Sequence, residues 1–463
     1  MSSTSYQHPL PEVLIAGAGL GGLLMAILLD KIGIPYRILE RASQVKALGA
    51  VMSLGPHIMP VFEQLGILDD LLKISIKCTS MNLLDESLKP MGSIKMDGQK
   101  DMTGYESVLF IRPELTQILL SKVPTSKILL NKQVVTIEDH PEEERVTVHC
   151  ADGSSYQAAL LIGADGTYSS VRQSLYKTLD EKGLLPKEDT KELEVGFACI
   201  VGTTGPMDPE KFPVLKDDYG HFDSIIGGVR HNWGACNINN NRFTWGMNLQ
   251  FTTEAEAKKE RFANAEWGPE ASTAEMLKEF LDRPCPFSGA KMRDIVEATP
   301  PELISKVYHE HKLYETWYHG RTVLIGDACH KLLPASGMGA TNAFQDVVVL
   351  ANCLFDLEDA SSKSITAAFQ SYYSQRYEKA RTAYNASLLM SKIMAGQTWS
   401  DRLIRTIFLN YLPHWVQQAE LQKTAGYRPQ IMFLPLAPTR GTVAPDPQPK
   451  CGRYVPPPLV APS

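Results

Sequence analysis

The stretch from residue 12 to residue 40 constrains the fold more strongly than any other part of the chain. The apolar residues Val13, Leu14 and Ile15 predict a short strand that runs into the turn Gly17-Ala18-Gly19-Leu20-Gly21-Gly22. An apolar helix follows and ends near Gly33, and a second strand closes at Glu40. This order is that of a βαβ unit with a GxGxxG turn, in which the helix N-terminus offers free N–H groups to the phosphates of a dinucleotide.

Each glycine of this turn has a geometric reason. Gly17 permits the tight turn, Gly19 lets a pyrophosphate approach the backbone, and Gly22 lets helix and strand pack closely. Glu40 ends the second strand, where a carboxylate can accept both hydroxyls of an adenosine ribose and disfavours a 2′-phosphate. The tightly bound dinucleotide is therefore predicted to be FAD or NAD rather than NADP. A glycine-rich turn without a ligand is the alternative, and the flanking strand, helix and acid count against it.

Length and composition limit the class of protein. With 463 residues the chain exceeds one ordinary core, so we expect two closely joined domains. It is 44% hydrophobic and 21% charged, as soluble globular proteins are. The formal net charge of −6 and the lack of a lysine or arginine stripe give no reason to expect nucleic acid as a partner.

We expect a cytoplasmic protein without a transmembrane segment. The 8 cysteines are scattered singly, as in a reducing compartment, and the N-terminus has no secretory pattern. No run reaches the roughly 20 apolar residues that a membrane span needs. The segment Leu403–Trp415, broken by Arg405 and Pro413, is expected to form an amphipathic helix packed on the body. The alternative is a helix that is peripheral on a membrane surface.

Small or acidic residues follow the ends of several predicted buried strands. They occur at Gly17–Gly22, at Asp165-Gly166, at Asp327 and at Gly337–Asn342. Open α/β sheets bind ligands at the carboxyl edge of their strands, so we expect these four segments to meet there.

On these motifs the sequence resembles the FAD-dependent monooxygenases of the aromatic-hydroxylase class, the family shaped like p-hydroxybenzoate hydroxylase. Three signatures carry the resemblance: the GxGxxG unit, Gly163-Ala164-Asp165-Gly166 with Ser169-Ser170-Val171-Arg172, and Gly326-Asp327-Ala328-Cys329-His330 with the loop around Gly337-Met338-Gly339-Ala340. The resemblance extends to about residue 440 and is weakest between 175 and 320. The pair His330-Lys331 and the closing Tyr427-Arg428-Pro429-Gln430 resemble a fungal branch of secondary metabolism. Met338 and Gln345 depart from the glutamine and glutamate that are common in relatives.

The resemblance implies an α/β fold with a Rossmann-like FAD-binding domain, an inserted antiparallel β-sheet substrate domain and C-terminal helices. Residues 1–175 and 319–400 are expected to form the FAD-binding domain, and residues 176–318 the substrate domain. Residues 401–463 are expected to form a C-terminal helix and a proline-rich tail that is loose after Thr442.

The resemblance also implies a division of work among the cofactor-binding residues. Glu40 is expected to bind the adenosine ribose, Arg112 the ribityl and pyrophosphate region, and Asp327 a ribityl hydroxyl. The loop through Gly337, Gly339 and Ala340 is expected to present N–H groups to the flavin and phosphates. Ser53 is expected to lie near the cofactor, and Asp165 to belong to a segment that serves both FAD and transient NADPH. The full predicted set is Gly17, Gly19, Gly22, Glu40, Ser53, Arg112, Asp165, Asp327, Gly337, Gly339 and Ala340.

The implied reaction is a monooxygenation with NADPH as transient co-substrate. NADPH reduces the bound FAD, and dioxygen then forms a flavin 4a-hydroperoxide that hydroxylates an aromatic or electron-rich small molecule. Epoxidation of a prenyl or terpenoid alkene is the alternative reaction. A FAD-holding binding protein without turnover is the alternative of another class, since it would keep every cofactor motif. The chain is expected to be a monomer or a homodimer.

The sequence is least informative about the catalytic base. A phenol substrate requires a group that accepts or relays its proton. Arg230 and Tyr219 are the catalytic candidates, with surface-loop residues as the alternative interpretation. His309, His311 and His319 have no cysteine pair or HExxH beside them, so no metal site is predicted.

Overall fold

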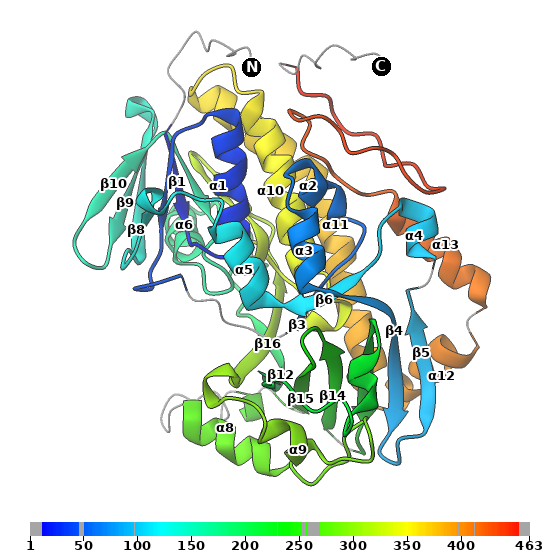
Figure 1. Ribbon diagram of the computed structural model, residues 1–463. Coiled ribbons are helices and arrows are strands. Elements are labelled where there is room, and N and C mark those ends of the chain that lie inside the picture. The colour runs from blue at the N-terminus through cyan, green and yellow to red at the C-terminus, as the bar shows by residue number, and fades with distance from the viewer. Residues whose placement is uncertain are drawn as a thin grey trace.

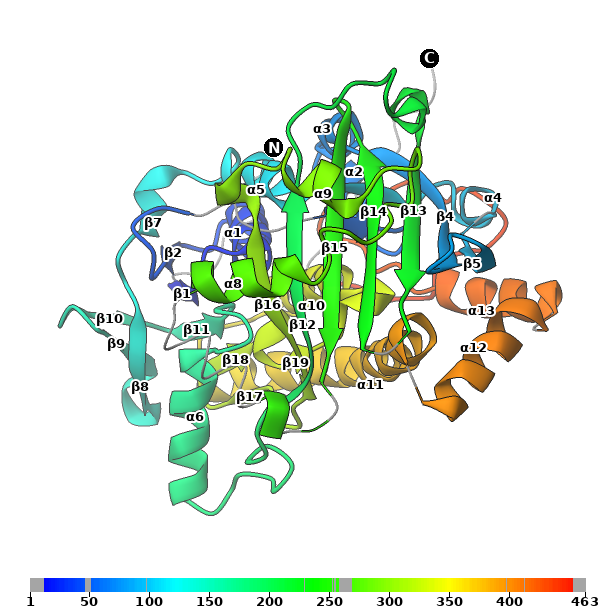
Figure 2. The same ribbon diagram turned by 90° about the horizontal axis from the view of Figure 1, so that it is seen from below.

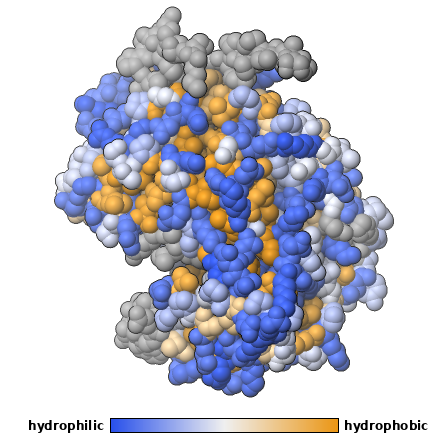
Figure 3. Space-filling model, viewed as in Figure 1, coloured by the Kyte–Doolittle hydropathy of each residue, from blue (hydrophilic) through white to orange (hydrophobic). Residues whose placement is uncertain are grey.

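The computed structural model describes residues 12–45, 51–96, 98–228, 230–251, 253, 255–257, 269–396, 398–411 and 413–452. Two sheets of different type organise the chain, one behind the helices α1 and α10 and one in the part that carries α8 and α9 (Figure 1). The outline of the molecule is indented between these two parts (Figure 3). Within the described residues, none of the helices has the length and apolar character needed to cross a membrane.

The first sheet has six strands and is mostly parallel. Its order is β17-β18-β11-β1-β2-β7, and β1 pairs in parallel with both β2 and β11. The strands have the bounds Val13–Ala16 (β1), Tyr36–Leu39 (β2), Ile128–Leu129 (β7), Leu160–Gly163 (β11), Tyr318–His319 (β17) and Thr322–Leu324 (β18). All four residues of β1 are buried, as expected for a parallel strand covered on both faces. A three-stranded antiparallel sheet of β8 (Val134–His140), β9 (Arg145–Cys150) and β10 (Ser155–Ala158) lies beside it.

The second sheet has ten strands and is mainly antiparallel. Its order is β19-β16-β12-β15-β14-β13-β4-β6-β3, with β5 paired to β4. The strands have the bounds Val51–Leu54 (β3), Ile76–Asp85 (β4), Pro90–Lys95 (β5), Val108–Ile111 (β6), Glu194–Thr203 (β12), Tyr219–Ile226 (β13), His231–Ile238 (β14), Arg242–Gln250 (β15), Ser305–Leu313 (β16) and His330–Lys331 (β19). The expected antiparallel sheet is therefore present. It also takes in β3 to β6, which precede residue 175, so the division of the chain at that residue stays a proposal.

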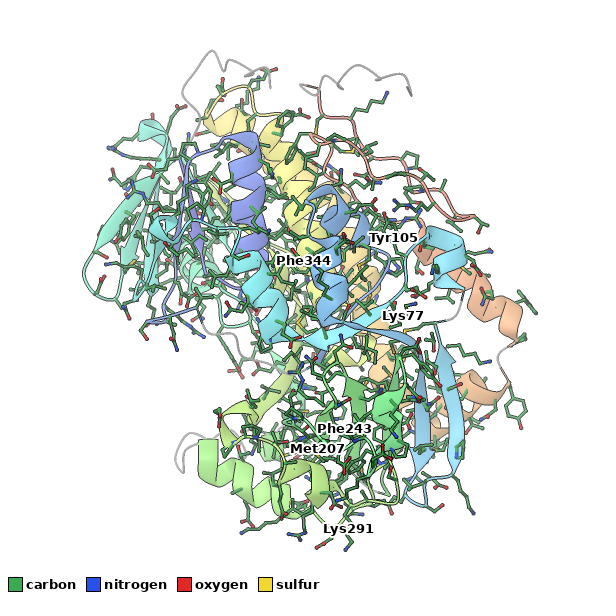
Figure 4. All side chains as sticks on the ribbon, viewed as in Figure 1. Lys77, Tyr105, Met207, Phe243, Lys291 and Phe344 are labelled. Atoms are coloured by element: carbon green, nitrogen blue, oxygen red, sulfur yellow. The ribbon has the colours of Figure 1, made fainter. Side chains whose placement is uncertain are left out.

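The helices cover the two sheets in separate groups. The first sheet carries α1 (Leu20–Ile32), α2 (Met59–Gln64), α3 (Leu68–Ile74), α5 (Arg112–Leu120), α6 (Ser170–Glu181) and α10 (Gly339–Phe355). The second has α8 (Pro269–Lys278) and α9 (Met292–Val296) on its outer face (Figure 2). The side chains form separate cores, with Phe344 of α10 in the first and Phe243 beside Met207 in the second (Figure 4).

Three helices and an extended tail complete the chain. They are α11 (Ser362–Ala395), α12 (Trp399–Asn410) and α13 (His414–Ala425), and the short α4 (Gln99–Thr103) lies beside α13. The expected amphipathic helix is present as α12, but only one of its faces is packed, and several apolar side chains on the other are exposed.

The prediction of a loose tail is wrong for residues 442–452. The Thr442 N–H donates to the Asp101 carbonyl (2.9 Å) and the Val443 N–H to the Met102 carbonyl (2.8 Å). Farther along, Gln448 accepts a hydrogen bond from the Gln430 N–H (3.1 Å). Proline removes N–H donors and fixes φ, which favours an extended chain, and this chain finds its partners on α4 and on neighbouring tail residues rather than within itself.

Candidate functional site

The segments expected to meet at the carboxyl edge of the first sheet do so. Because β1, β11 and β18 are parallel, the residues that follow them emerge on one side. The Thr167 hydroxyl donates to Asp327 (3.3 Å), and the Arg172 guanidinium donates to the Ala328 carbonyl (2.9 Å). The Ser53 hydroxyl donates to the Gly337 carbonyl (3.2 Å). These contacts join segments that are up to 284 residues apart in the sequence.

The glycine turn after β1 is closed by packing at two positions and open at a third. Gly17 has a φ of +99°, in the left-handed region, and a Cβ atom there would lie 2.6 Å from the Ala164 carbonyl oxygen. A Cβ atom at Gly22 would lie 2.0 Å from the Gly17 carbonyl oxygen, so only glycine lets α1 start this close to the strand. A Cβ atom at Gly19 would meet no atom within 4 Å. Space for a ligand is thus left at Gly19.

Glu40 lies beside this turn, at the end of β2. One of its carboxylate oxygens accepts a hydrogen bond from the Ala18 N–H (2.8 Å) and the other from the Ala42 N–H (2.9 Å). The carboxylate is therefore held in one orientation next to the open position at Gly19. This is the position that an acceptor of ribose hydroxyls requires, and the binding role itself stays a prediction.

The loop before α10 forms a second concave part of the site. Gly337 has a φ of +64°, and a Cβ atom there would lie 2.5 Å from the Ser53 hydroxyl oxygen. A Cβ atom at Gly339, the first residue of α10, would meet nothing within 4 Å. The helices α1 and α10 pack against each other (Figure 1). The N-terminus of α10 therefore offers free N–H groups and partial positive charge at an open surface, which suits an anionic or carbonyl-rich ligand.

Asp327 is the acidic centre of the site. Its carboxylate forms an ion pair with Lys331 (2.6 Å) in addition to the bond from Thr167. Burial raises the pKa of Asp327, but the positive charges of Lys331, His330 and Arg112 outweigh it and hold that pKa below its usual value. Arg112, the first residue of α5, is exposed and close enough for its charge to act on Asp327. The two residues predicted to contact the ribityl region are thus brought together.

One carboxylate oxygen of Asp165 caps the start of α6, and the other has no hydrogen-bond partner among the described residues. Its Oδ2 accepts a hydrogen bond from the Val171 N–H (3.1 Å) in the first turn of α6, and its Oδ1 is buried without a partner. Burial raises the pKa of this carboxyl. Arg172, in the same signature, is buried and donates to the carbonyls of Thr167 and Ala328. Arg172 therefore ties the Asp165 and Asp327 segments together, and the role of Asp165 in cofactor binding stays a prediction.

A buried ionic network supports the Asp327 turn from behind. Asp346 of α10 is fully buried and accepts hydrogen bonds from the Gly326 N–H (2.9 Å), His330 Nε2 (2.5 Å) and Arg376 Nε (2.8 Å). Burial raises the pKa of Asp346, but His330 and Arg376 lower it further than burial raises it. Cys329, His330 and Asp346 lie within the mutual distances of a metal triad. Both oxygens of Asp346 are engaged in these bonds, and the arrangement is that of a hydrogen-bond network.

The two catalytic candidates lie in the second sheet, without a described contact to the cofactor residues above. Tyr219 begins β13, is 42% exposed, and its ring lies against that of His221 at a tilt of 40°. Arg230, at a φ of +73°, donates to the Gln250 carbonyl (3.2 Å) and forms an ion pair with Glu256. Their catalytic roles stay predictions.

Sequence reasoning missed polar residues on the inner face of the second sheet. Trp233 and Met247 are cross-strand partners in the outer core with α8 and α9, so the next pair, Asn232 and Asn248, lies on the opposite face. Within the described part of the chain, neither carboxamide has a hydrogen-bond partner. His309 of β16, considered from the sequence only as a metal ligand, is partly buried, and burial and Lys331 lower its pKa to about 4. No motif marks these positions; only strand register reveals them.

The residues at this edge fit FAD on three observations. The positions at Gly19 and Gly339 are open, Gly17 and Gly22 permit the close turn, and Asp165 has one buried oxygen without a partner. Glu40 and Asp327 supply carboxylate acceptors of the kind that sugar and ribityl hydroxyls need, one in each part of the site. The open backbone positions and the two carboxylate acceptors together therefore match an elongated ligand with phosphates in its middle and hydroxyls on both sides.

Comparison with known proteins identifies this arrangement. The FAD binding domain family matches residues 11–192 and 245–387. The FAD-dependent monooxygenase ptmM of Penicillium ochrochloron is 28% identical over 417 residues, covering 87% of this chain and 93% of the relative. The FAD-dependent monooxygenase ausM of Emericella nidulans is 26% identical over 455 residues, covering 94% of this chain and 89% of the relative.

Solved structures share the fold. Klebsiella pneumoniae HpxO, complexed with FAD and uric acid, has a TM-score of 0.71 at 21% identity, covering 92% of this chain and 100% of that one. CtdE, in complex with FAD and a substrate, has a TM-score of 0.63 at 18% identity, covering 90% of this chain and 97% of that one. The two-sheet architecture with a glycine turn at the sheet edge is thus that of known FAD-binding proteins.

Proposed function

Since the chain belongs to the FAD binding domain family and is an FAD-dependent monooxygenase, we propose that it uses NADPH and dioxygen to hydroxylate an aromatic or otherwise electron-rich small molecule. When bound, the flavin takes electrons from NADPH and activates dioxygen, so that one oxygen atom enters the substrate and the other leaves as water. The residues of the chain supply binding, orientation and proton handling.

The observation that carries this proposal is how the second sheet is attached to the cofactor site. One edge strand is β3, whose Ser53 bonds to the Gly337 loop, and the other is β19, whose Lys331 pairs with Asp327. Both edges of the ten-stranded sheet are therefore fixed to cofactor-binding segments. A sheet held in this way spans the site and can enclose a substrate against the cofactor, which excludes water from the reacting atoms.

The inner face of the sheet supports a substrate with a neutral hydrogen-bonding group. Asn232 is almost fully buried, and its carboxamide and that of its neighbour Asn248 are unpaired within the described residues. These carboxamides leave donor and acceptor positions that a substrate hydroxyl or carbonyl can take on binding. Carboxamides both donate and accept, so they suit a phenol, quinone or ketone better than a carboxylate.

We propose His309 as a neutral hydrogen-bond acceptor that orients a phenolic hydroxyl. Burial and the charge of Lys331 lower its pKa to about 4, so the imidazole is neutral at pH 7 and can accept a hydrogen bond, but it is too weak a base to hold a phenolic proton. Lys331, whose charge reaches His309, can polarise the same hydroxyl. Arg230 and Tyr219 stay the catalytic candidates, although Arg230 is already engaged by Glu256.

The test is anaerobic stopped-flow reduction of the purified yellow protein by NADPH, with and without a panel of phenols, quinones and prenylated aromatics. We expect rapid loss of the oxidised flavin absorbance only with certain compounds, and a product heavier by one oxygen atom once air is admitted. NADH serves as the matched control for the reductant.

Absence of reduction by NADPH and by NADH with every compound would refute the proposal and favour a FAD-holding binding protein. Oxygen incorporation at an alkene instead of a ring carbon would replace hydroxylation by epoxidation. The Asn232→Ala and Asn248→Ala variants should raise KM at unchanged kcat, because they remove binding that is equal in ground and transition states.

A further inference from the structure

The helices α12 and α13 carry an apolar face that no described residue of the chain covers. Trp399, Tyr411 and Trp415 are 79%, 74% and 72% exposed. Leu403, Ile404 and Ile407 lie between them and are exposed as well. The spacing 399, 403, 407 and 411 places four of these side chains in one row along α12. Figure 2 shows α12 and α13 at the edge of the molecule, where α12 lies beside β5 of the second sheet.

Buried contacts fix the rotation of α12, so this exposure is built in. Arg405, on the side of the helix away from the row, is buried and donates to the carbonyls of Ile393 (3.3 Å) and Gly396 (3.1 Å) at the end of α11. These carbonyls carry the partial negative charge of the α11 C-terminus, which favours a guanidinium there. Phe408 and Leu409 pack with Leu83 and Ile393 on the same side. Turning the apolar row inward would unpair Arg405 and empty this cluster.

We propose that this face of α12 and α13 docks the protein onto a lipid membrane surface. Amphipathic helices that lie in the bilayer interface combine aliphatic residues with tryptophan or tyrosine, whose rings prefer the headgroup level. Here the three aromatic side chains border the three aliphatic ones. The helix is too short to span a bilayer and needs only to lie on it.

Local charge supports an anionic lipid surface. Lys392, Arg402 and Lys423 are exposed on the three C-terminal helices, and none of them pairs with a described carboxylate. Asp401, the acidic residue of α12, is turned to the helix start, where it accepts a hydrogen bond from the Thr398 N–H (3.2 Å). The Arg402 guanidinium also donates to the Gly228 carbonyl (3.5 Å), which leaves Lys392 and Lys423 as the two cations available to anionic headgroups in a protein with a net charge of −6.

The exposed aromatic side chains alone make this face a large apolar patch. At the exposures above, the three aromatic side chains present roughly 300 to 600 Å², since such side chains bury about 150 to 250 Å² each. That already reaches the largest apolar patch of ordinary monomers, about 300 to 600 Å².

The experiment is flotation of the FAD-loaded full-length protein with vesicles of neutral phosphatidylcholine, and with vesicles that also contain anionic phosphatidylserine. We expect co-flotation that is stronger with the anionic vesicles and weaker at high salt. Leu403→Ser/Ile407→Ser should reduce the partition coefficient at least about tenfold, because both side chains lose burial in the lipid. The matched control is Leu184→Ser/Leu72→Ser, which changes two exposed leucines outside this face and should bind as the wild type does.

Retained FAD absorbance in each variant shows that the chain is folded. Flotation measures membrane binding directly, so its result does not depend on catalytic turnover. Wild-type protein that co-floats with neither kind of vesicle would overturn the proposal. So would equal binding of the Leu403→Ser/Ile407→Ser variant, which would locate the contact elsewhere. A concentration-dependent dimer that the same variant abolishes, with no vesicle binding, would assign the face to a second copy instead.

Discussion

Replacing Asp346 by asparagine should destabilise the protein far more than its small change in shape suggests. The carboxylate is fully buried and accepts from Arg376 Nε, His330 Nε2 and the Gly326 N–H. An asparagine side chain has one acceptor oxygen. Whichever way it is turned, its NH₂ group faces a donor, either the Arg376 guanidinium or the Gly326 N–H.

The magnitude follows from what remains buried. Arg376 keeps its charge and is also fully buried, with only Tyr427 and Asn342 left as partners. Breaking a buried ion pair on one side costs about 3 to 5 kcal/mol. At a urea m-value of about 3 kcal/mol/M, the unfolding midpoint should fall by about 1 to 1.7 M. Because Asp346 also holds the Gly326 N–H beside Asp327, the variant should release FAD at lower urea concentration.

The assay is urea unfolding followed by tryptophan fluorescence and by flavin release. Asp70→Asn is the matched control, since Asp70 forms an exposed ion pair with Lys73 (3.3 Å) and should change stability by less than about 1 kcal/mol. An Asp346→Asn protein within about 1 kcal/mol of the wild type would refute the reasoning about the network.

The same residue predicts a pH dependence. Its folded-state pKa is lowered, so its contribution to stability is present above the unfolded value of about 3.9 and is lost as pH falls through the folded pKa. The stability gap between wild type and Asp346→Asn should therefore narrow as pH is lowered from 5 toward 3. A gap that is constant over this range would show that the carboxylate charge is not the source of the effect.

Three further substitutions test the site. Gly22→Ala places a Cβ atom 2.0 Å from the Gly17 carbonyl oxygen and should yield protein without FAD, visible as a missing flavin absorbance, whereas Gly196→Ala, where a Cβ meets nothing within 4 Å, should stay yellow. Glu40→Ala should weaken FAD binding by about tenfold or more in a fluorescence titration, through loss of a charged acceptor, and an unchanged Kd would remove Glu40 from the site. His309→Ala should raise the KM for a phenol by about threefold to tenfold through loss of a hydrogen bond, while the wild-type KM stays level from pH 7 down to about 5 because the pKa of His309 is about 4; a change in KM near pH 6.5 would contradict this.

The order of the motifs was enough to predict the cofactor half of the molecule. A strand, a GxGxxG turn and a helix form a local unit, so the conformations of Gly17 and Gly22 depend on neighbours within a few residues or on the adjacent parallel strand. Asp327 and the Gly337 loop were likewise predictable, because each follows a buried apolar strand and parallel strands end at one edge.

For the substrate half, the sequence predicted an antiparallel sheet but not which strands form it. An antiparallel sheet was expected between residues 176 and 318, but β3 to β6, at residues 51–111, also join it. Pairing across such distances depends on which edges meet after the chain has collapsed, and no local pattern specifies it. The proline-rich tail shows the same limit, since its hydrogen-bond partners lie on α4.

The sequence by itself determined that the chain binds a dinucleotide at a sheet edge. The glycine turn after β1 is a local structure, and at Gly17 and Gly22 only glycine avoids a clash with the backbone. Tertiary structure alone decided which residues face the substrate and which face the solvent. Strand register places Asn232 and His309 on the inner face of the second sheet. Tyr219 lies at an exposed strand end. The apolar row of α12 faces outward because Arg405 binds the carbonyls at the end of α11. These positions depend on the packing of segments that are distant in the sequence, and the hydrophobic periodicity of the sequence does not predict such packing.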